Sequence, residues 1–158
     1  MSVPTRVLFR EAMASLASGV TVITARRADG EPCGLAATST ASFSADPPSV
    51  MVSIAHASRC HDTLAGCERF GVHILGADEE PAARLFASRE DHKFSQLEWA
   101  WDGAVPELGG AIAYLRCRRS DTFARYDHSI LIGDLEGGRH GHGEPLLYAH
   151  RRMNWMLR

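Results

Sequence analysis

Short apolar runs that follow one another closely, with no repeated strand–helix unit between them, limit what this chain can fold into. The run from Val20 to Thr24 is rich in β-branched residues, and the Asp29-Gly30 pair after it is a tight hairpin signal. Strands at such spacing are typical of antiparallel barrels, whereas a doubly wound sheet alternates strands with helices. We therefore expect a mainly β fold, β with flanking helices. Further strands are predicted at residues 50–54, 70–75, 111–122, 129–135 and 146–148.

Three stretches have helical patterns. The first is a predicted helix that Thr5 caps and that ends before Gly19; apolar residues recur along it at helical spacing. A short second helix is predicted to begin at a Ser58 cap, and a third covers residues 79–88. Residues 89–110 follow no regular period, so we expect a polar loop with embedded aromatic side chains there.

The composition indicates one globular domain that spans residues 1–158. An apolar content of 45% and a charged content of 23% are ordinary for a soluble protein. The formal net charge of −2, without a basic patch, argues against nucleic acid as a partner. We expect no membrane segment, because no apolar run reaches the roughly 20 residues that span a bilayer. We also expect no signal peptide, because the N-terminus lacks the apolar stretch and the cleavage site of one. The four cysteines form no CxxC pair, so we expect reduced thiols in a cytoplasmic protein.

The segment from Gly34 to Val50, GLAATSTASFSADPPSV, combines small residues with a row of hydroxyls and ends in Pro47-Pro48. Short side chains let a flat ligand approach the backbone, and hydroxyl and amide groups offer hydrogen bonds to a polar chain or a phosphate. The two prolines keep the backbone extended before the next strand. The pattern predicts a bed for a cofactor. Its hydroxyls belong to Thr38, Ser39, Thr40, Ser42, Ser44 and Ser49.

The sequence Ser58-Arg59-Cys60 brings a hydroxyl, a guanidinium and a thiol to an expected helix N-terminus. Free amides and the helix dipole favour an anion at such a place. Taken alone, the residues also fit an ordinary N-cap serine beside a solvent-exposed arginine. Because the hydroxyl-rich segment lies one strand earlier, adjacent strands can bring both loops to one end of the sheet. This placement favours a phosphate site.

Two further pairs place a charged group beside a ring. Lys93-Phe94 offers a cation and an aromatic face, which suit a second phosphate or a stacked ring, but also a surface loop anchored by one buried Phe. In Asp127-His128 the carboxylate can fix the imidazole tautomer, which makes His128 a candidate for redox assistance or for docking a polar ligand. Taken alone, a pair such as Asp127-His128 is more often a hydrogen-bonded turn than a site, and the residues leave both interpretations open.

Motifs of several other protein classes are absent. There is no GxGxxG between a strand and a helix, no GxxxxGK[ST] and no GxSxG, which argues against a Rossmann nucleotide site, a P-loop NTPase and a serine hydrolase. His140-Gly-His142 and the pair His56 and His61 invite a metal site. No carboxylate or cysteine lies at a recognisable ligand spacing from them, so we expect no metal. His73 alternates with apolar neighbours and is predicted to be structural or interfacial.

Taken in order along the chain, these motifs resemble the short-chain flavin reductase family, the reductase components of two-component flavin-dependent monooxygenases. The similarity covers residues 9–152 and rests on the order of many short motifs. They are Ser18-Gly-Val-Thr-Val-Ile-Thr24, Asp29-Gly30, Gly34 to Pro48, Ser58-Arg-Cys60, Arg69-Phe-Gly-Val72, Lys93-Phe94, Pro106-Glu-Leu108, Asp127-His128, Ile132-Gly133 and Pro145-Leu-Leu-Tyr148. The resemblance implies an FMN-binding split β-barrel that works as a homodimer, with flavin near the subunit interface.

The resemblance also implies roles for single residues. The bed of the isoalloxazine ring and ribityl chain falls on Thr38, Ser39, Thr40 and Ser44. The flavin phosphate site falls on Ser58, Arg59 and Cys60. The pair that flanks the cofactor is Lys93 and Phe94, and the catalytic residue on the nicotinamide side is His128. This chain has Tyr126 before Asp127-His128, where the family usually has Gly.

The activity implied by the resemblance is that of an NAD(P)H:flavin oxidoreductase. Such an enzyme reduces FMN or FAD by hydride transfer from NADH or NADPH and supplies the reduced flavin to a partner monooxygenase. Hydride transfer needs no protein nucleophile, and the sequence shows none, because the cofactors carry the difficult chemistry. Two alternatives stay open: a split-barrel flavoprotein oxidase of the pyridoxamine-phosphate-oxidase type, and a non-catalytic flavin carrier or sensor.

Overall fold

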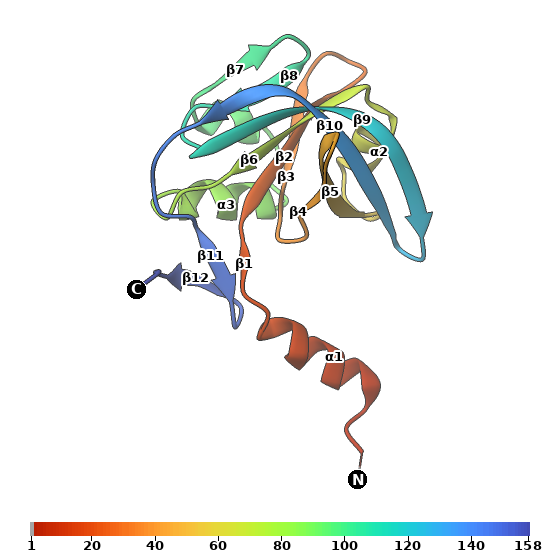
Figure 1. The fold of residues 1–158 in the computed structure, drawn as a ribbon, viewed down its shortest axis with the longest axis vertical. Coiled ribbons are helices and arrows are strands. Elements are labelled where there is room, and N and C mark those ends of the chain that lie inside the picture. The colour runs from red at the N-terminus through yellow and green to blue at the C-terminus, as the bar shows by residue number, and fades with distance from the viewer. Residues whose placement is uncertain (1) are drawn as a thin grey trace.

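The computed structural model describes residues 2–158 and contains one strongly curved sheet flanked by short helices (Figure 1). Seven strands form this sheet in the order β3-β2-β6-β9-β10-β5-β4. Each strand is antiparallel to its neighbours. The strands are β2 (Thr21–Arg26), β3 (Pro32–Ala37), β4 (Ala41–Ala45), β5 (Pro48–Ala55), β6 (Arg69–Ile74), β9 (Ala113–Arg125) and β10 (His128–His140). Over residues 2–158 no ladder joins β3 to β4 or β5, so the barrel is split. The predicted fold class is confirmed.

The remaining elements surround this barrel. The strands β7 (Trp99–Asp102) and β8 (Val105–Leu108) form a hairpin, and β1 (Ser18–Gly19), β11 (Leu147–Ala149) and β12 (Arg152–Trp155) form a small sheet. The helices are α1 (Thr5–Ala14), α2 (His61–Gly66), α3 (Glu80–Ala87) and the 3₁₀ helix η1 (Lys93–Gln96). Within residues 2–158 no helix is long and apolar enough to cross a membrane.

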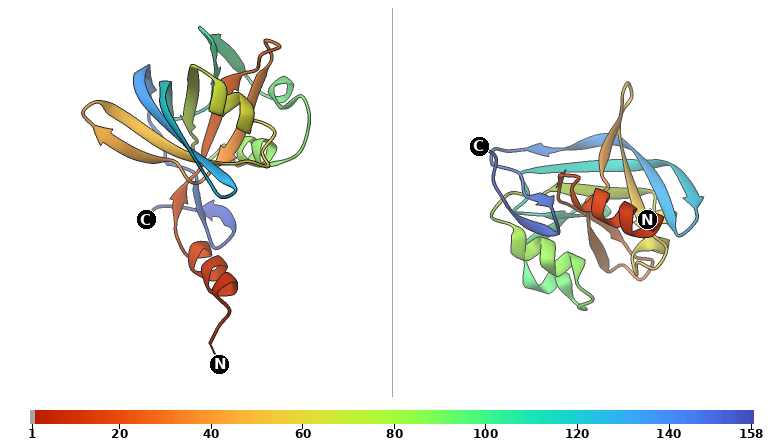
Figure 2. Two further views of the ribbon diagram at one scale, coloured as in Figure 1. Left: turned by 90° about the vertical axis from the view of Figure 1, so that its right-hand side faces the viewer. Right: turned by 90° about the horizontal axis from the view of Figure 1, so that it is seen from below.

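Helix α1 projects away from the barrel, beside the small sheet of β11 and β12 (Figures 1 and 2). None of its residues is buried within this chain. The helix starts at Thr5 itself, with Pro4 in the capping position, so Thr5 is not the side-chain cap that the sequence predicted. It ends at Ala14, because the chain turns to form β1 rather than continuing to Gly19. The apolar side chains that α1 and the residues after it expose are Val7, Leu8, Phe9, Met13 and Leu16.

Strand β2 runs through the centre of the molecule and is buried on both faces. Successive side chains of a strand point to opposite faces. Ile23 therefore joins the apolar cluster that fills the barrel, while Val22 joins a second cluster that includes Phe86 of α3. These two clusters hold β2 and β3 rigidly between the barrel interior and α3, and this wall carries the site described below.

Two segments differ from the prediction. Residues 99–108, expected in an irregular loop, form the β7–β8 hairpin, whose turn uses Gly103 at φ 62°. Strand β10 continues past Gly137-Gly138 to His140, although the glycines were expected to bound it. A Cβ at Gly138 would collide with the Tyr114 carbonyl of β9, so this glycine permits a close approach between two strands. The ladder shifts register at Leu135/Gly137, which is a β-bulge or similar irregularity.

Candidate functional site

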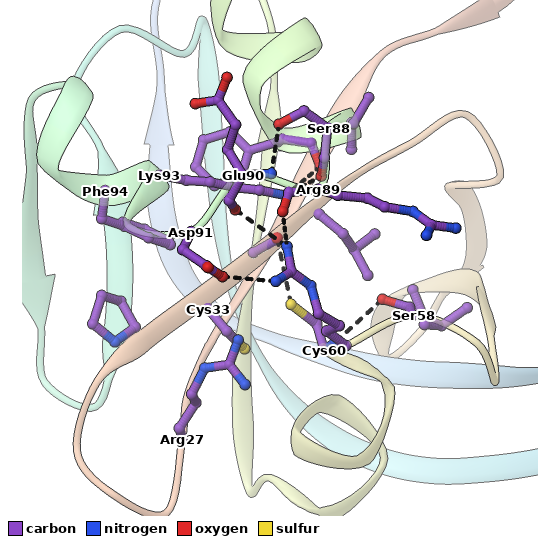
Figure 3. Close-up of a pocket in the computed structure, with 18 of the residues that line it drawn as sticks. Arg27, Cys33, Ser58, Cys60, Ser88, Arg89, Glu90, Asp91, Lys93 and Phe94 are labelled. Carbon is purple, nitrogen blue, oxygen red and sulfur yellow. Dashed lines mark hydrogen bonds and ion pairs between the residues drawn. The ribbon is translucent and has the colours of Figure 1, made fainter.

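A cavity of about 1500 Å³ opens along the split of the barrel, beside β3 (Figure 3). Its walls come from the hairpin at residues 27–31, from β3 and the end of β5, and from the loop at residues 57–60. Residues 86–95, Trp99 and Trp101 of β7, and His128 complete the lining. Ligand sites usually measure roughly 300–1,000 Å³, so this cavity has room for a large ligand.

The structure brings together most of the residues that the sequence selected. Those that line the cavity are Ser39, Ser58, Arg59, Cys60, Lys93, Phe94 and His128. Thr38, Thr40 and Ser44 lie outside its lining. Thr40 Oγ1 is 2.8 Å from Thr21 Oγ1, and Ser44 Oγ donates to the Asp46 carbonyl at 3.1 Å. The contact of these three residues with a ligand stays a prediction.

Ser39 bridges the split between β3 and β5. Its Oγ donates to the Ser53 carbonyl at 2.9 Å and accepts the Ser53 backbone N–H at 3.2 Å. A single side chain thus pairs with both backbone groups of one residue on a strand that β3 does not otherwise reach by a ladder. The bridge fixes the wall of the cavity where the sheet is open.

Ser58 shapes the turn that leads into α2. Its Oγ accepts the backbone N–H of Cys60 at 3.2 Å, and the helix starts at His61 rather than directly after Ser58. The predicted helix is therefore present but begins later, because the Ser58 side chain caps the preceding turn. This turn delivers Arg59 and Cys60 to the cavity.

Arg59 ties the loop at residues 88–95 across the mouth of the cavity. Its Nη1 forms an ion pair with Asp91 Oδ1 at 2.7 Å. Its Nη2 donates to the carbonyls of Arg89 at 2.6 Å and Glu90 at 3.2 Å (Figure 3). Five N–H groups are available on a guanidinium, so donors remain for an anion in the cavity.

The Lys93-Phe94 pair anchors the same loop at residues 88–95. Lys93 Nζ donates to the carbonyls of Phe86 at 3.1 Å and Ser88 at 2.8 Å, at the end of α3. Partial burial lowers the pKa of Lys93 from its usual value. Phe94 is buried, and its ring meets Phe86 and Trp99 edge-on at centroid distances of 5.3 and 5.2 Å. Of the two interpretations of this pair, the loop anchored by a buried Phe is confirmed, while Lys93 still faces the cavity.

Two thiols lie on the floor of the cavity. Cys60 Sγ donates to the Gly34 carbonyl at 3.4 Å, and Cys33 lies beside it in the same apolar cluster. A hydrogen bond from Cys33, helped by the charges of Arg27 and Lys93, lowers the pKa of Cys60 to about 7. The same contact and burial raise the pKa of Cys33. The sequence reasoning missed Cys33 and Arg27, and the only local signal was their position next to a predicted hairpin.

His128 lines the cavity, and its neighbour Asp127 sets the tautomer of its imidazole. Its Nδ1 lies 2.8 Å from Asp127 Oδ1, as the sequence predicted for this pair. The hydrogen bond from the imidazole holds the pKa of the Asp127 carboxyl below its usual value. Nδ1 therefore carries the proton and Nε2 is left as the free nitrogen. Tyr126, at φ 53°, adopts the left-handed backbone in the turn before this pair, and its 85% exposed ring lies outside the cavity lining.

Two other histidines share one hydroxyl. Nε2 of His56 and Nε2 of His61 lie 3.0 and 2.8 Å from Ser129 Oγ, and their ring centroids are 4.6 Å apart. His61 Nδ1 also lies 2.9 Å from Asp62 Oδ1. Ser129 itself is buried, so these side chains brace α2 against β10.

The family model of the flavin reductase like domain matches residues 13–156 of this chain. The chain belongs to the flavin reductase-like family. It is 43% identical over 147 residues to an NADH:riboflavin 5′-phosphate oxidoreductase of Streptomyces pristinaespiralis, a match that covers 91% of this chain and 84% of the relative. It is 35% identical to the FMN reductase (NADH) SmoA of Agrobacterium fabrum, with 89% and 80% covered.

A solved structure agrees with this membership of the flavin reductase-like family. The NADH:FAD oxidoreductase SgcE6 of Streptomyces globisporus, in complex with NAD and FAD fragments, superimposes with a TM-score of 0.89 at 29% identity. The match covers 96% of this chain and 94% of that one.

The residues of the cavity fit a flavin nucleotide. Cationic side chains (Arg27, Arg59 and Lys93) line it and suit a phosphate, which binds guanidinium and ammonium groups strongly. Small residues of β3, among them Gly34, Ala36 and Ala37, form part of the wall, and their short side chains leave room for a flat ring. The cavity volume exceeds what a small ligand needs.

Proposed function

We propose that this member of the flavin reductase-like family is an NADH-dependent flavin reductase that reduces FMN or FAD and supplies the reduced flavin to a partner monooxygenase. The observation that carries the proposal is the large cavity lined by cations, among them Arg27, Arg59 and Lys93, and by His128. Relatives named as NADH:flavin oxidoreductases match most of the chain at up to 43% identity. A relative named as the NADH-dependent flavin reductase StyB matches 78% of the chain.

The protein's own part in the reaction is to bind and align. The bound flavin and nicotinamide supply the hydride acceptor and the hydride donor. Ser58, Arg59 and Cys60 hold the flavin phosphate at the mouth, where the guanidinium keeps donors available. The Ser39–Ser53 bridge keeps the ring wall in place, and the anchored Phe94 loop limits the access of water. Alignment of two reactants contributes up to roughly 7–11 kcal/mol in favourable cases.

His128 borders the nicotinamide in this proposal. Because Asp127 fixes its tautomer, it presents Nε2 as a hydrogen-bond acceptor to the polar edge of a bound ring. Thr38, Thr40 and Ser44 contact the flavin from the hydroxyl-rich segment. His128→Asn tests the role: we expect KM for NADH to rise while the dissociation constant of FMN stays the same. Equal losses for both ligands would contradict the role.

The activity is tested by steady-state oxidation of NADH and of NADPH, each with FMN and with FAD. We expect fast oxidation of NADH that depends on added flavin. Flavin that binds tightly without consuming NADH would contradict the proposal and support a flavin carrier. Reduction of the flavin by an amine or alcohol substrate without nicotinamide would support an oxidase of the pyridoxamine-phosphate-oxidase type.

We propose further that the protein is a homodimer in the cytoplasm. The exposed apolar residues of α1 support a second copy as their cover, since so many large apolar side chains on one free helix are costly in water. The four free thiols support a reducing compartment. Light scattering tests the first point: we expect a dimer that Phe9→Glu dissociates, whereas Arg84→Glu on α3 leaves it intact. A monomeric wild type would contradict it.

Relatives that are reductase components support a monooxygenase as the partner. One is the reductase component of a 4-nitrophenol monooxygenase from Rhodococcus opacus, 32% identical over 91% of this chain. The partner oxygenase is tested by adding reduced flavin from this enzyme to a purified flavin-dependent monooxygenase. We expect product formation that depends on NADH, flavin and both proteins.

A further inference from the structure

Arg27 is a cation in the cavity whose guanidinium has no partner among the described residues. It lies at the start of the hairpin after β2, is half-buried, and lines the cavity. Its guanidinium makes no hydrogen bond or ion pair with any other residue in the described range 2–158, and no dashed line reaches it in Figure 3. Arg59 and Lys93, by contrast, both donate to backbone carbonyls: Arg59 to Arg89 of the loop, and Lys93 to Phe86 at the end of α3. A half-buried charge without a partner costs free energy, which points to an anion from outside the chain.

The acidic residues of the same hairpin do not neutralise it. Asp29 and Glu31 also line the cavity, but neither forms an ion pair with Arg27 among the described residues. Asp29 Oδ1 accepts the Glu31 backbone N–H at 3.0 Å, so this carboxylate is used by the hairpin turn itself. Arg27 therefore remains available to a ligand. The positive charge of Arg27 also acts on Cys60 in the cavity, because it helps to lower the pKa of that thiol.

Trp101 offers a flat apolar surface along the same cavity. It is 41% exposed, although it lies on a strand and is held edge-on by Trp99 at a centroid distance of 5.1 Å. Trp99 meets Phe94, and Phe94 meets Phe86, so a row of rings fixes Trp101 to α3. The Arg26 guanidinium lies 5.4 Å from the centre of the Trp101 ring. An exposed indole that is held rigidly suits stacking with a nucleobase, which is worth roughly 1–3 kcal/mol per base.

The cavity extends beyond the residues of the proposed flavin phosphate site. Ser58 and Arg59 lie at the α2 side, whereas Arg27 and Trp101 come from the hairpin and from β7. The volume of about 1500 Å³ exceeds the roughly 300–1,000 Å³ of an ordinary site, so one ligand leaves room for a further group.

We propose that Arg27 and Trp101 form a subsite for the adenosine end of an adenosine 5′-diphosphate group, in which Arg27 binds the adenosine-side phosphate and Trp101 stacks on the adenine. The inference rests on the proposed function, because FAD and NADH both carry this end, whereas FMN carries only the flavin-side phosphate. The chain then distinguishes dinucleotides from FMN by a contact that lies away from the reacting rings.

The test uses the purified full chain with three variants: Arg27→Gln, Trp101→Ala, and Arg84→Ala as a control on the outer face of α3. Dissociation constants of FMN, FAD and ADP are measured by titration, and KM for NADH is measured with saturating FMN. If the group belongs to FAD, both site variants weaken FAD and ADP by about tenfold or more and leave FMN unchanged. If it belongs to NADH, they weaken ADP and raise KM for NADH by a similar factor, again with FMN unchanged.

Either pattern supports the subsite, and the two arms identify which dinucleotide uses it. Unchanged binding of ADP, FAD and NADH in both variants overturns the proposal. An equal loss for FMN and FAD overturns it as well, because Arg27 would then hold the phosphate that both flavins share. Trp101→Phe, which keeps an aromatic face, restores most of the affinity if stacking is the cause. The titrations of FMN, FAD and ADP do not depend on turnover. If the wild type binds flavins without oxidising NADH, the proposed function is refuted, and the ADP titration still decides whether the subsite exists.

Discussion

The imidazole Nε2 of His73 accepts the backbone N–H of Leu108 at 3.1 Å, which joins β6 to the β7–β8 hairpin. The other nitrogen, Nδ1, donates to the Val22 carbonyl of β2 at 3.1 Å. One ring thus satisfies a donor and an acceptor from two other strands, and it does so only as the neutral tautomer with the proton on Nδ1. His73 is fully buried, and its predicted structural role is confirmed. Burial lowers its pKa to about 4.

The first prediction is a loss of stability in mild acid. The folded pKa of His73 is lower than that of an exposed histidine, near 6.5, so the unfolded chain binds one more proton between these values. The contribution of His73 to the free energy of unfolding is complete above about pH 6.5 and falls by roughly 3 kcal/mol as the pH drops to about 4. Urea denaturation between pH 7.5 and 4 measures it.

A variant without a titratable ring separates His73 from the other groups that titrate in this range. His73→Gln keeps a donor and an acceptor but cannot bind a proton there. We expect its stability curve to lose the one-proton slope between pH 6.5 and 4, even if it is less stable at pH 7.5. Parallel curves for the two proteins would show that His73 does not cause the acid sensitivity.

The second prediction concerns the Arg59 tether. Arg59→Ala frees the loop at residues 88–95 and removes donors from the proposed phosphate site, so we expect FMN to bind roughly 10- to 100-fold more weakly. Asp91→Asn removes the ion pair but keeps the guanidinium, and its FMN affinity should remain within about threefold of the wild type. Fluorescence titration of FMN measures both. If Asp91→Asn lost as much affinity as Arg59→Ala, Arg59 would act through the loop rather than on the ligand.

The third prediction concerns the wall at Gly34. A Cβ at this position would lie 2.8 Å from Phe86 Cε1 and 3.3 Å from the Ile23 carbonyl oxygen. Phe86 is buried against Phe94 and cannot move aside freely. We expect Gly34→Ala to lower the free energy of unfolding by about 1–3 kcal/mol through overpacking. Gly19→Ala is the control, because no atom lies within 4 Å of its added Cβ, and thermal unfolding of the two variants makes the comparison. Equal shifts would contradict this explanation.

Much of the fold was predictable because the apolar periods of the long strands are strong. The β7–β8 hairpin was not, since each strand has four residues and period-2 alternation is not decisive over such a length. The end of β10 was misplaced for a different reason. Gly138 looked like a boundary, but its role depends on the Tyr114 carbonyl of a partner strand, which no local pattern reveals.

The site residues that belong to short sequence motifs were predictable. Those whose role follows only from the tertiary structure were not. Ser58, Arg59 and His128 were selected from short patterns, and the cavity brings them together. Arg27 and Trp101 were not selected as site residues, because an arginine after a strand and a tryptophan in an irregular stretch carry no signal alone. Their meaning comes from the tertiary structure: Arg27 has no partner among residues 2–158, and Trp101 is exposed on a cavity wall.

The fourth prediction concerns the reactivity of Cys60. The lowered pKa of Cys60 increases its thiolate fraction at neutral pH, whereas burial raises the pKa of Cys67 to about 11. We expect iodoacetamide to label Cys60 before Cys67 at pH 7, although Cys67 is the less buried residue, and the midpoint of the rate at Cys60 to lie below that of an ordinary thiol. Bound FMN should slow the labelling, since Cys60 lines the cavity. Cys33→Ala removes the hydrogen bond that stabilises the thiolate and should move this midpoint upward. Peptide mass spectrometry after timed labelling measures each site, and faster labelling of Cys67 at pH 7 would refute the lowered pKa.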